Sequence, residues 1–506
     1  MFSRVQPSLL SPRLDADFYK TEFISNEAHL KDFGVKRLAQ LIDVKASGYG
    51  VLPSSNEYCD DGVPLIRGGD LSFGEVVSPS VFAPLSYKNG KGTAIDGDVL
   101  ILIKGACIDG PEGVARVKQD NHGNLFNGSC FRLAFADREV DGPFFIAYSQ
   151  SKFFLRQKKR QVANTGISYN DEDSIHGYLI PDLENGVKKY IGDKVRQAEQ
   201  LRAWAKSVQQ QAVELLPAYI REIHRYEAQS YRAKDIVPER LDSLFYHPDY
   251  IALERKMKAK GCNRLGLVAK QIKDSWNKKK AETFEYYEIG GLDITTGQVL
   301  STKTQTVGAP SRAKTKVQQG DVLVSTVRPN RKNVGFIVDS VTDSEMVATS
   351  GFSVLRFSSL AQAAFYHAWL RTDDATAQLM RWNSGSAYPA IDDDVPLNII
   401  VPEFEQEFVD SWGQKLLDAQ FAYVYARKLT EAAKTLVEAL IEGQLTEQQL
   451  IQAQQTLDDG DNSLDQAILS KLSSEGYGID GATPLFNDID ELYRLMESAA
   501  QAEAEA

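Results

Sequence analysis

The sequence predicts an α+β protein of two tandem β-rich globules, each followed by a long helix, the two helices pairing as an antiparallel coiled coil with pseudo-twofold symmetry. Three observations predict this fold: a helical seam near the middle of the chain, the return of that seam at a constant offset in the second half, and short β-branched runs before each seam. Apolar or small residues at steps of three and four mark one helix face. The seam residues are Ile191, Val195, Ala198, Leu201, Val208, Leu215, Trp412, Leu416, Ala419, Leu429, Leu436 and Leu440.

The first long helix is expected from Val187 to about Ile223, and the second at 406–441. A helix of about 37 residues is roughly 55 Å long, so a pair of them is a rod that separates whatever precedes each helix. Equal globules at opposite ends of that rod require opposed helices. Pro217 should kink or end the first helix, whereas its counterpart Glu438 would not.

The globules are identified by motifs that return in the same order. Arg13 to Tyr19 (RLDADFY) returns as Arg240 to Tyr246 (RLDSLFY), and Gly97 to Leu100 (GDVL) returns as Gly320 to Leu323. Such repetition indicates a tandem duplication. The predicted segments are a first globule at 1–184, the first long helix and its linker at 185–235, a second globule at 236–403, the second long helix at 404–443 and an acidic tail at 444–506.

Each globule is expected to be β-rich first and helical last. Val99 to Ile103 and Val322 to Val327 are β-branched runs after a Gly-Asp turn, which is typical of strands. Phe144 to Arg156 and Ala361 to Met380 have the pattern of amphipathic helices.

Composition and charge limit the classes of function. With 43% apolar and 25% charged residues, no apolar run of membrane-spanning length and no signal-peptide core, the chain is expected to be cytoplasmic. The four cysteines form no CxxC pair, so no metal site is predicted. The net charge is −12, yet residues 251–340 hold seventeen Lys and Arg against eight acids, so an anionic ligand such as DNA is compatible with that region.

In the order of its motifs the chain resembles the specificity (S) subunit of type I restriction-modification systems over about residues 12–443. The resemblance rests on the repeated Arg-Leu-Asp-x-x-Phe-Tyr opening, the Gly-Asp-Val-Leu strand start, the turns at Thr165-Gly166 and Ser384 to Ser386, and the helix entrance Val401 to Val409 (VPEFEQEFV). The first half departs at its helix entrance, Pro181 to Gly186 (PDLENG), which has Asn in place of Gln and a glycine.

The resemblance implies that each globule is a target recognition domain and that the chain itself is not an enzyme. It implies double-stranded DNA as a partner, together with two DNA methyltransferase (modification) subunits and a restriction/motor subunit. S-adenosylmethionine, ATP and Mg are then expected on those partner subunits, with no cofactor bound by this chain.

Candidate DNA contacts are basic or amide residues in loops, because Arg, Lys, Asn and Gln read base edges and phosphates attract positive charge. The loop Arg328 to Asn333, which follows a predicted strand directly, is the first choice. The candidates are Arg67, Lys104, Lys152, Arg156, Lys158, Lys159 and Arg160 in the first half, and Lys303, Arg312, Lys314, Lys316, Arg328, Asn330, Arg331 and Lys332 in the second. For any one of them the alternative is a solvated surface charge.

Catalytic motifs are missing: the sequence has no Asn-Pro-Pro-aromatic methyltransferase motif, no Gly-rich cofactor loop and no P-loop. A pattern that superficially resembles a nuclease motif is formed by Pro248-Asp249 and Glu254 to Lys256. We interpret it as a solvated helix face. The acidic cluster Asp392 to Asp394 and its counterpart at 171–173 read as turns or helix caps. The competing function is a protein-protein scaffold or adaptor with duplicated binding globules on a coiled-coil rod; a stand-alone enzyme is disfavoured.

The tail has thirteen acids and two bases between Gln444 and Ala506. Its polar, Gln-rich composition predicts that much of it cannot fold alone. Asp488 to Met496 is the exception, because Ile489, Leu492 and Met496 share one helical face. Two interpretations stay open: a solvated extension with a loosely attached helix, or a segment that docks on the rod or on a partner and competes with DNA.

Overall fold

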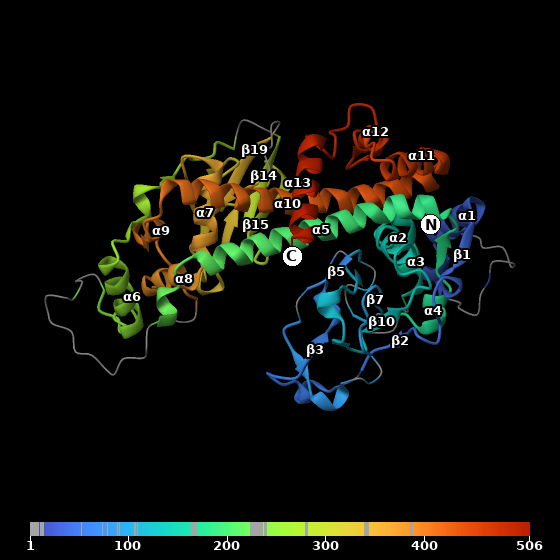
Figure 1. Cartoon of the computed structure of the whole chain (residues 1–506), viewed down its shortest axis with the longest axis horizontal. Helices are drawn as coiled ribbons and strands as arrows, with labels where there is room; N and C mark the ends of the chain where they lie inside the picture. The colour runs from blue at the N-terminus through green and yellow to red at the C-terminus, as the bar shows by residue number, and fades with distance from the viewer. Residues whose placement is uncertain are drawn as a thin grey trace. The chain divides into compact units, whose positions relative to one another are not determined.

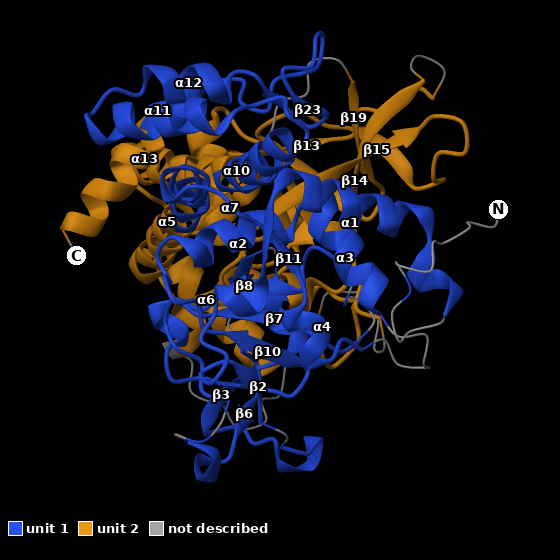
Figure 2. Ribbon diagram, turned by 90° about the vertical axis from the view of Figure 1, so that its right-hand side faces the viewer, with its two compact units in different colours: residues 1–199, 426–493 blue, residues 200–425, 494–506 orange. Residues whose placement is uncertain are grey.

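The computed structural model describes residues 10, 15–51, 53–72, 74–77, 79–88, 90, 92–105, 108, 110–162, 169–222, 236, 240–278, 282–338, 344–384 and 388–505. Arg13-Leu14 of the first opening motif, Thr165-Gly166 and Gly385-Ser386 lie outside these residues. The chain is mixed α+β and forms two compact units (Figures 1 and 2). Unit 1 holds residues 1–199 and 426–493, and unit 2 holds residues 200–425 and 494–506.

The globule of unit 1 is built around a six-stranded sheet of order β2-β10-β7-β8-β5-β4, with a three-stranded sheet β6-β3-β9 and a separate pair β1-β11. Buried Leu100, Leu102, Ala115 and Phe126 form part of its core. Its elements are α1 (Thr21–Phe33), β1 (Val35–Arg37), β2 (Gly48–Tyr49), β3 (Val63–Ile66), β4 (Leu71–Ser72), β5 (Gly74–Val76), β6 (Phe82–Ala83), β7 (Val99–Leu102), β8 (Val114–Arg116), β9 (Leu125–Phe126), β10 (Cys130–Leu133), α2 (Asp141–Ser149), α3 (Lys152–Gln161), α4 (Glu172–His176) and β11 (Leu179–Pro181).

The globule of unit 2 repeats this order around an eight-stranded sheet, β13-β20-β17-β18-β15-β14-β19-β16, and a separate pair β12-β21. Central β17 is antiparallel to β18 and β20, as β7 is to β8 and β10. Its elements are α6 (Pro248–Ala259), β12 (Asn263–Arg264), β13 (Lys270–Ile272), β14 (Thr283–Asp293), β15 (Gln298–Gln305), β16 (Ala313–Lys316), β17 (Val322–Ser325), β18 (Val334–Phe336), β19 (Glu345–Thr349), β20 (Phe352–Arg356), α7 (Leu360–Leu370), α8 (Asp373–Arg381), α9 (Val395–Asn398) and β21 (Ile400–Val401).

The repeated Gly-Asp-Val-Leu motif begins strands β7 and β17 with a buried carboxylate. Gly97 and Gly320 have φ of 83° and 85°, a turn conformation that favours glycine. Asp98 is fully buried and accepts a hydrogen bond from Arg138 Nε at 2.8 Å, and Asp321 is fully buried and accepts two from Arg356, at 2.7 and 2.8 Å. Burial raises the pKa of both carboxyl groups, and the arginines oppose that rise.

The single helices expected at 144–156 and 361–380 are each two helices in the structure. Ser151 ends the first segment by capping α3, where its hydroxyl accepts a hydrogen bond from Phe154 N at 3.3 Å. Thr372, its counterpart in the second half, caps α8 by accepting one from Ala375 N at 3.3 Å. Both caps start a new helix because a side-chain oxygen satisfies an otherwise unpaired backbone N–H. The amphipathic pattern alone did not predict these breaks.

The long helices are α5 (Asn185–Leu215) and α10 (Gln406–Ile441). Helix α5 ends at Leu215, short of the expected end near Ile223, because Pro217 two residues later ends it rather than kinking it. Helix α10 continues past Glu438. Of the seam residues, ten are buried, Trp412 is half-buried, and Leu215 is 52% exposed. Leu215 therefore departs from the predicted seam: the helix ends there, and the next residue, Leu216, takes the buried place at 6% exposure.

One glycine in each long helix allows a close approach by the preceding globule. A Cβ at Gly192 would lie 3.2 Å from Pro143 Cβ of α2, and a Cβ at Gly413 would overlap the backbone carbonyl of Ala361 in α7. The two glycines occupy the same position of the repeated helix. Glycine weakens a helix interior by about 0.5–1 kcal/mol, so the close packing of helix on helix offsets that cost at both sites.

The tail is folded and packs on α5, so the prediction that much of it cannot fold alone stays a prediction. It contains α11 (Glu447–Asp458), α12 (Ser463–Leu469), the pair β22 (Leu472–Ser473) and β23 (Gly476–Tyr477), and α13 (Ile489–Ala504). The first half of α13 is the helix expected at 488–496. In unit 1, residues 447–493 pack on the first half of α5: Lys194 Nζ lies 2.6 Å from Asp465 Oδ1, both side chains being at most 2% exposed. Tyr190 donates a 2.5 Å hydrogen bond to the same carboxylate. The segment folds because α5 supplies the surface that it lacks alone.

Candidate nucleic-acid interface

The loop at 328–333 has an unusual backbone. It follows β17 and contains a short 3₁₀ turn at Pro329–Arg331, flanked by Arg328 and Lys332 with φ of 52° and 54°. Within the described ranges these are the two non-glycine residues with positive φ. A non-glycine residue in the left-handed region costs of order 1–3 kcal/mol, and such strain gathers at functional sites.

Contacts at both ends of the loop hold it in this conformation. Arg328 N donates to Pro389 O at 2.7 Å, and Ser325 N donates to Asn333 O at 2.9 Å. Lys332 Nζ lies 2.7 Å from Asp373 Oδ1, and this hydrogen bond lowers the pKa of the Asp373 carboxyl group. Lys332 therefore fastens the loop to α8.

Of the remaining candidates of this loop, two face solvent and Arg328 is half-buried. Asn330 and Arg331 are exposed, and the Arg328 guanidinium lies 5.2 Å from the ring centroid of Tyr388, itself 70% exposed. A guanidinium over an aromatic face is attracted to it while its donors stay available. Arginine donors, an amide and an aromatic ring are thus presented together, which is the chemistry that contacts nucleic-acid bases and phosphates.

The other basic candidates of unit 2 lie on or beside strands. Lys303 on β15 is exposed and stands opposite Glu285 of β14. Arg312 and Lys314 are exposed as well, whereas Lys316 lies 3.2 Å from Glu345. Their positions allow contact with an anionic ligand but do not bring all of them to the strained loop.

In unit 1 the same strand end carries Lys104, whose counterpart in unit 2 is Val327, the residue just before the loop. Lys104 follows β7, is exposed, and forms an isolated backbone bridge with Tyr169; the matching bridge in unit 2 joins Val327 to Ala390. The Tyr169 hydroxyl lies 3.5 Å from that of Tyr49. In each globule, therefore, a basic residue and an exposed tyrosine lie near the end of the central strand, β7 or β17.

Two first-half candidates on α3, Lys158 and Arg160, make contacts within the globule. Lys158 is fully buried and donates to Gly110 O at 3.1 Å. Arg160 lies 4.1 Å from the Phe18 ring centroid, donates to Phe18 O at 3.0 Å and forms an ion pair with Glu27.

Unit 2 repeats the Arg160 cluster with other residues, which explains its role. Arg381 lies 4.4 Å from the Phe245 ring centroid, donates to Phe245 O at 3.1 Å and forms an ion pair with Glu254. The phenylalanines come from the two opening motifs, so the arginines fasten each opening to its globule. The sequence signal for this role is an arginine that recurs at the same offset as the helical seam.

The other first-half candidates differ in their surroundings. Lys152 forms an ion pair with Glu442, and Arg67 donates to Ser80 at 3.0 Å beside Asp70. Arg156 is half-buried and Lys159 is exposed. Lys104 is therefore the first-half candidate that lies at the same strand end as the loop of unit 2.

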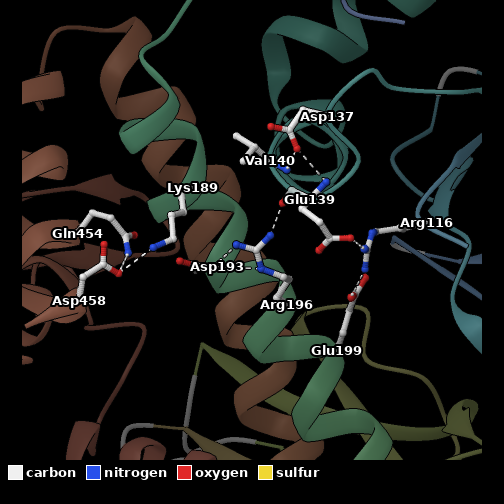
Figure 3. A network of polar contacts seen from close by, with 10 residues as sticks. All are labelled: Arg116, Asp137, Glu139, Val140, Lys189, Asp193, Arg196, Glu199, Gln454 and Asp458. Carbon is white, nitrogen blue, oxygen red and sulfur yellow. Dashed lines mark hydrogen bonds and ion pairs between the residues drawn. The ribbon is translucent and has the colours of Figure 1, made fainter. Parts of the chain in front are cut away.

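A polar network fastens the globule of unit 1 to α5 (Figure 3). Arg116 of β8 lies 3.1 Å from Glu199 and 3.3 Å from Glu139, and the Arg116 and Glu199 side chains are each 10% exposed. Arg196 bonds Asp193 and the Glu139 carbonyl, which adds a second link. An arginine and a carboxylate in near-buried contact make a strong, directional junction.

Unit 2 makes its junction with amides. The main-chain carbonyl of Gln420, the counterpart of Glu199, accepts a 2.7 Å hydrogen bond from the Gln298 side chain. The side-chain amide of Gln420 donates to Thr296 O at 3.1 Å. Gln209 of α5 also donates to Thr296 O at 3.1 Å. The sequence had indicated neither junction.

The described part of the chain offers no group of three His, Cys, Asp or Glu side chains placed to hold a metal ion. Asp171 caps α4 by accepting a hydrogen bond from Ser174 N at 2.8 Å, which confirms the cap interpretation for that cluster. Glu254 of the nuclease-like pattern is on helix α6 and pairs with Lys258 and Arg381. Across the described helices, none is both long and apolar enough for a membrane span.

Comparison with known proteins gives structural matches and no sequence match. No family model and no curated protein matches the sequence. The chain is similar to the type I restriction-modification S subunit from M. genitalium (14% identity, TM-score 0.37, 83% of this chain and 95% of that one) and to the HsdS subunit from Thermoanaerobacter tengcongensis (14%, 0.28, 81% and 97%). A third match, at 15% identity and a TM-score of 0.27, covers 83% of this chain and 97% of a chain from a study of complex assembly and conformational transition in the type I R-M system.

Proposed function

We propose that this chain is the non-catalytic DNA sequence-specificity subunit of a type I restriction-modification complex. One observation carries the proposal: each globule presents exposed side chains of DNA-binding chemistry at the end of the same strand, Lys104 after β7 and the Arg328 loop after β17. Two such DNA-binding globules fit a bipartite DNA site. The globule at 1–184 would bind one half-site and the globule at 236–403 the other.

The long helices are proposed to pair antiparallel, about a pseudo-twofold axis, and to set the spacer between the half-sites. Support comes from the membership of the units: residues 185–199 of α5 share unit 1 with 426–441 of α10, and 200–215 share unit 2 with 406–425. Each unit thus combines the beginning of one helix with the end of the other. Four residues inserted into both helices would then lengthen the preferred spacer by a fixed number of base pairs.

The proposed partners are double-stranded DNA, two DNA methyltransferase (modification) subunits and a restriction/motor subunit, in the cytoplasm. S-adenosylmethionine, ATP and Mg would bind to those subunits, where the chemistry takes place. This chain would contribute the choice of sequence and no reacting group.

The test is to express the chain with its methyltransferase partner in a host lacking restriction-modification genes and to map methylated bases across the genome. The expected result is a single motif of two short half-sites separated by an unread spacer. A second complex carries the triple substitution Arg328→Ala, Asn330→Ala and Arg331→Ala. Its sequence requirement should become less strict at one half-site only. Methylation without a bipartite motif, or none while the complex assembles, would favour the scaffold alternative.

A further inference from the structure

We infer that Tyr49 and Tyr169 form the DNA-contacting surface of the first globule together with Lys104, with the aromatic rings rather than positive charge providing most of the contact. This inference rests on the proposed function and assigns part of the interface to residues of another chemical type. The candidates taken from the sequence were all basic or amide side chains.

The first observation is the loss of cations from the predicted set. Lys158 is buried, Arg160 is engaged with Phe18 and Glu27, and Lys152 is paired with Glu442. Arg67, Lys104, Arg156 and Lys159 remain of the predicted first-half cations, and Lys104 is the one that bridges Tyr169 at the end of β7. A reader there needs another source of contact.

The second observation is the placement of the two tyrosines. Tyr169 forms a backbone bridge with Lys104 at the end of β7, the place that in unit 2 lies beside the strained loop. Tyr49 belongs to β2, at the edge of the same sheet, and its hydroxyl lies 3.5 Å from that of Tyr169. The residues are 39% and 37% exposed, in contrast to the buried tyrosines of this globule such as Tyr148 and Tyr178.

The third observation is that the Tyr49 ring packs against the core of the globule. It packs edge-on against fully buried Phe131, with ring centroids 5.1 Å apart. Burial, followed by the contact with Tyr169, raises the pKa of the Tyr49 hydroxyl, which is neutral at pH 7 even at the ordinary tyrosine pKa of 10. A neutral, pre-positioned aromatic surface contacts sugars, thymine methyl groups and bases without losing much side-chain entropy.

Unit 2 shows the same combination in a more cationic form. Tyr388, 70% exposed, lies under the Arg328 guanidinium. Each globule thus pairs an exposed tyrosine with a basic residue at the strand end. The first globule presents more aromatic surface and less positive charge than the second. Binding to its half-site should therefore depend less on salt concentration.

The experiment measures binding by the complex with its methyltransferase partner. The unaltered complex first defines the bipartite motif by methylated-base mapping. Fluorescence anisotropy then gives Kd at several salt concentrations for the cognate duplex and for duplexes with either half-site scrambled. The variants are Tyr49→Ala with Tyr169→Ala, the same pair changed to Phe, and Lys104→Ala.

The alanine pair should weaken cognate binding on the order of tenfold or more while leaving the slope of log K against log salt unchanged, and should lose discrimination at one half-site. Lys104→Ala should reduce that slope by about one. The phenylalanine pair should bind nearly as the unaltered complex does, and all variants should have matching circular dichroism and melting curves.

Unchanged affinity of the folded alanine pair would overturn the inference, as would an equal loss in the phenylalanine pair. A bipartite motif for the unaltered protein with normal binding by the tyrosine variants would refute only this inference. Absence of any motif for the unaltered protein would refute the proposed function itself.

Discussion

The buried ion pair between Lys194 and Asp465 should decide whether the tail stays on α5. Asp465→Asn preserves shape but removes the negative charge that Lys194 and the hydroxyls of Tyr190 and Tyr493 contact. The Lys194 and Asp465 side chains are 1% and 2% exposed, so water screens little of the interaction. Removing one partner of a buried pair costs about 3–5 kcal/mol because the other charge is left unpaired.

Amide hydrogen exchange followed by mass spectrometry is the suitable assay, because local release of the tail need not unfold the chain. At about 1.36 kcal/mol per tenfold, protection in peptides from 447–493 should fall on the order of 10²- to 10⁴-fold. Asp458→Asn is the matched control: it removes the exposed partner of Lys189 and should change nothing measurable. Equal protection in the Asp465→Asn and unaltered proteins would refute the reasoning.

The same pair makes the tail sensitive to acid. Burial alone would raise the pKa of Asp465, but Lys194, Tyr190 and Tyr493 together lower it below the ordinary value of 3.8. The folded protein therefore binds this proton more weakly than the unfolded chain does. Stability from Asp465 is present above its ordinary pKa and is lost as pH falls through the lowered folded pKa. Release of 447–493 at neutral pH and retention in acid would contradict this sign.

Three further outcomes are expected. Changing Arg328, Asn330 and Arg331 to Ala should cost about 1–3 kcal/mol per lost base contact and alter one half-site only, which methylated-base mapping would show; equal relaxation of both would contradict the two-reader scheme. Gly413→Ala should lower the melting temperature, because overlap with a backbone carbonyl outweighs the helix-propensity gain of up to about 1 kcal/mol; a higher melting temperature would disprove the close approach. Arg381→Met should destabilise the second globule by about 1.5–3 kcal/mol in urea titrations, since its charged hydrogen bonds are lost; an unchanged midpoint would make the cluster dispensable.

The sequence was sufficient for features that depend on spacing. The seam with steps of three and four predicted both long helices, and Pro217 predicted the end of α5, because periodicity and the missing proline N–H act locally. The mixed α+β class followed from this seam together with the short β-branched runs before it, which are also local patterns.

Features that depend on contacts distant in sequence were beyond such reasoning. The tail composition predicts that much of it cannot fold alone, and the α5 surface around Lys194, on which it packs, comes from far earlier in the chain. Lys158 and Arg160 look like a basic patch, although one points into the globule and the other reaches back to Phe18, far earlier in the chain. The tyrosine pair joins residues from distant parts of the sequence, so its proximity left no local pattern.

The two junctions between globule and long helix limit how the halves of this protein can be exchanged. Arg116 requires the carboxylate of Glu199, whereas Gln298 bonds the backbone of Gln420, whose side chain is an amide. If the first globule were grafted before the second helix, Arg116 would meet that amide and a nearly buried positive charge would lose its counter-charge. The reverse graft would leave Glu199 without its arginine. A new recognition module is therefore compatible with this framework only when it brings the matching residue of the helix with it.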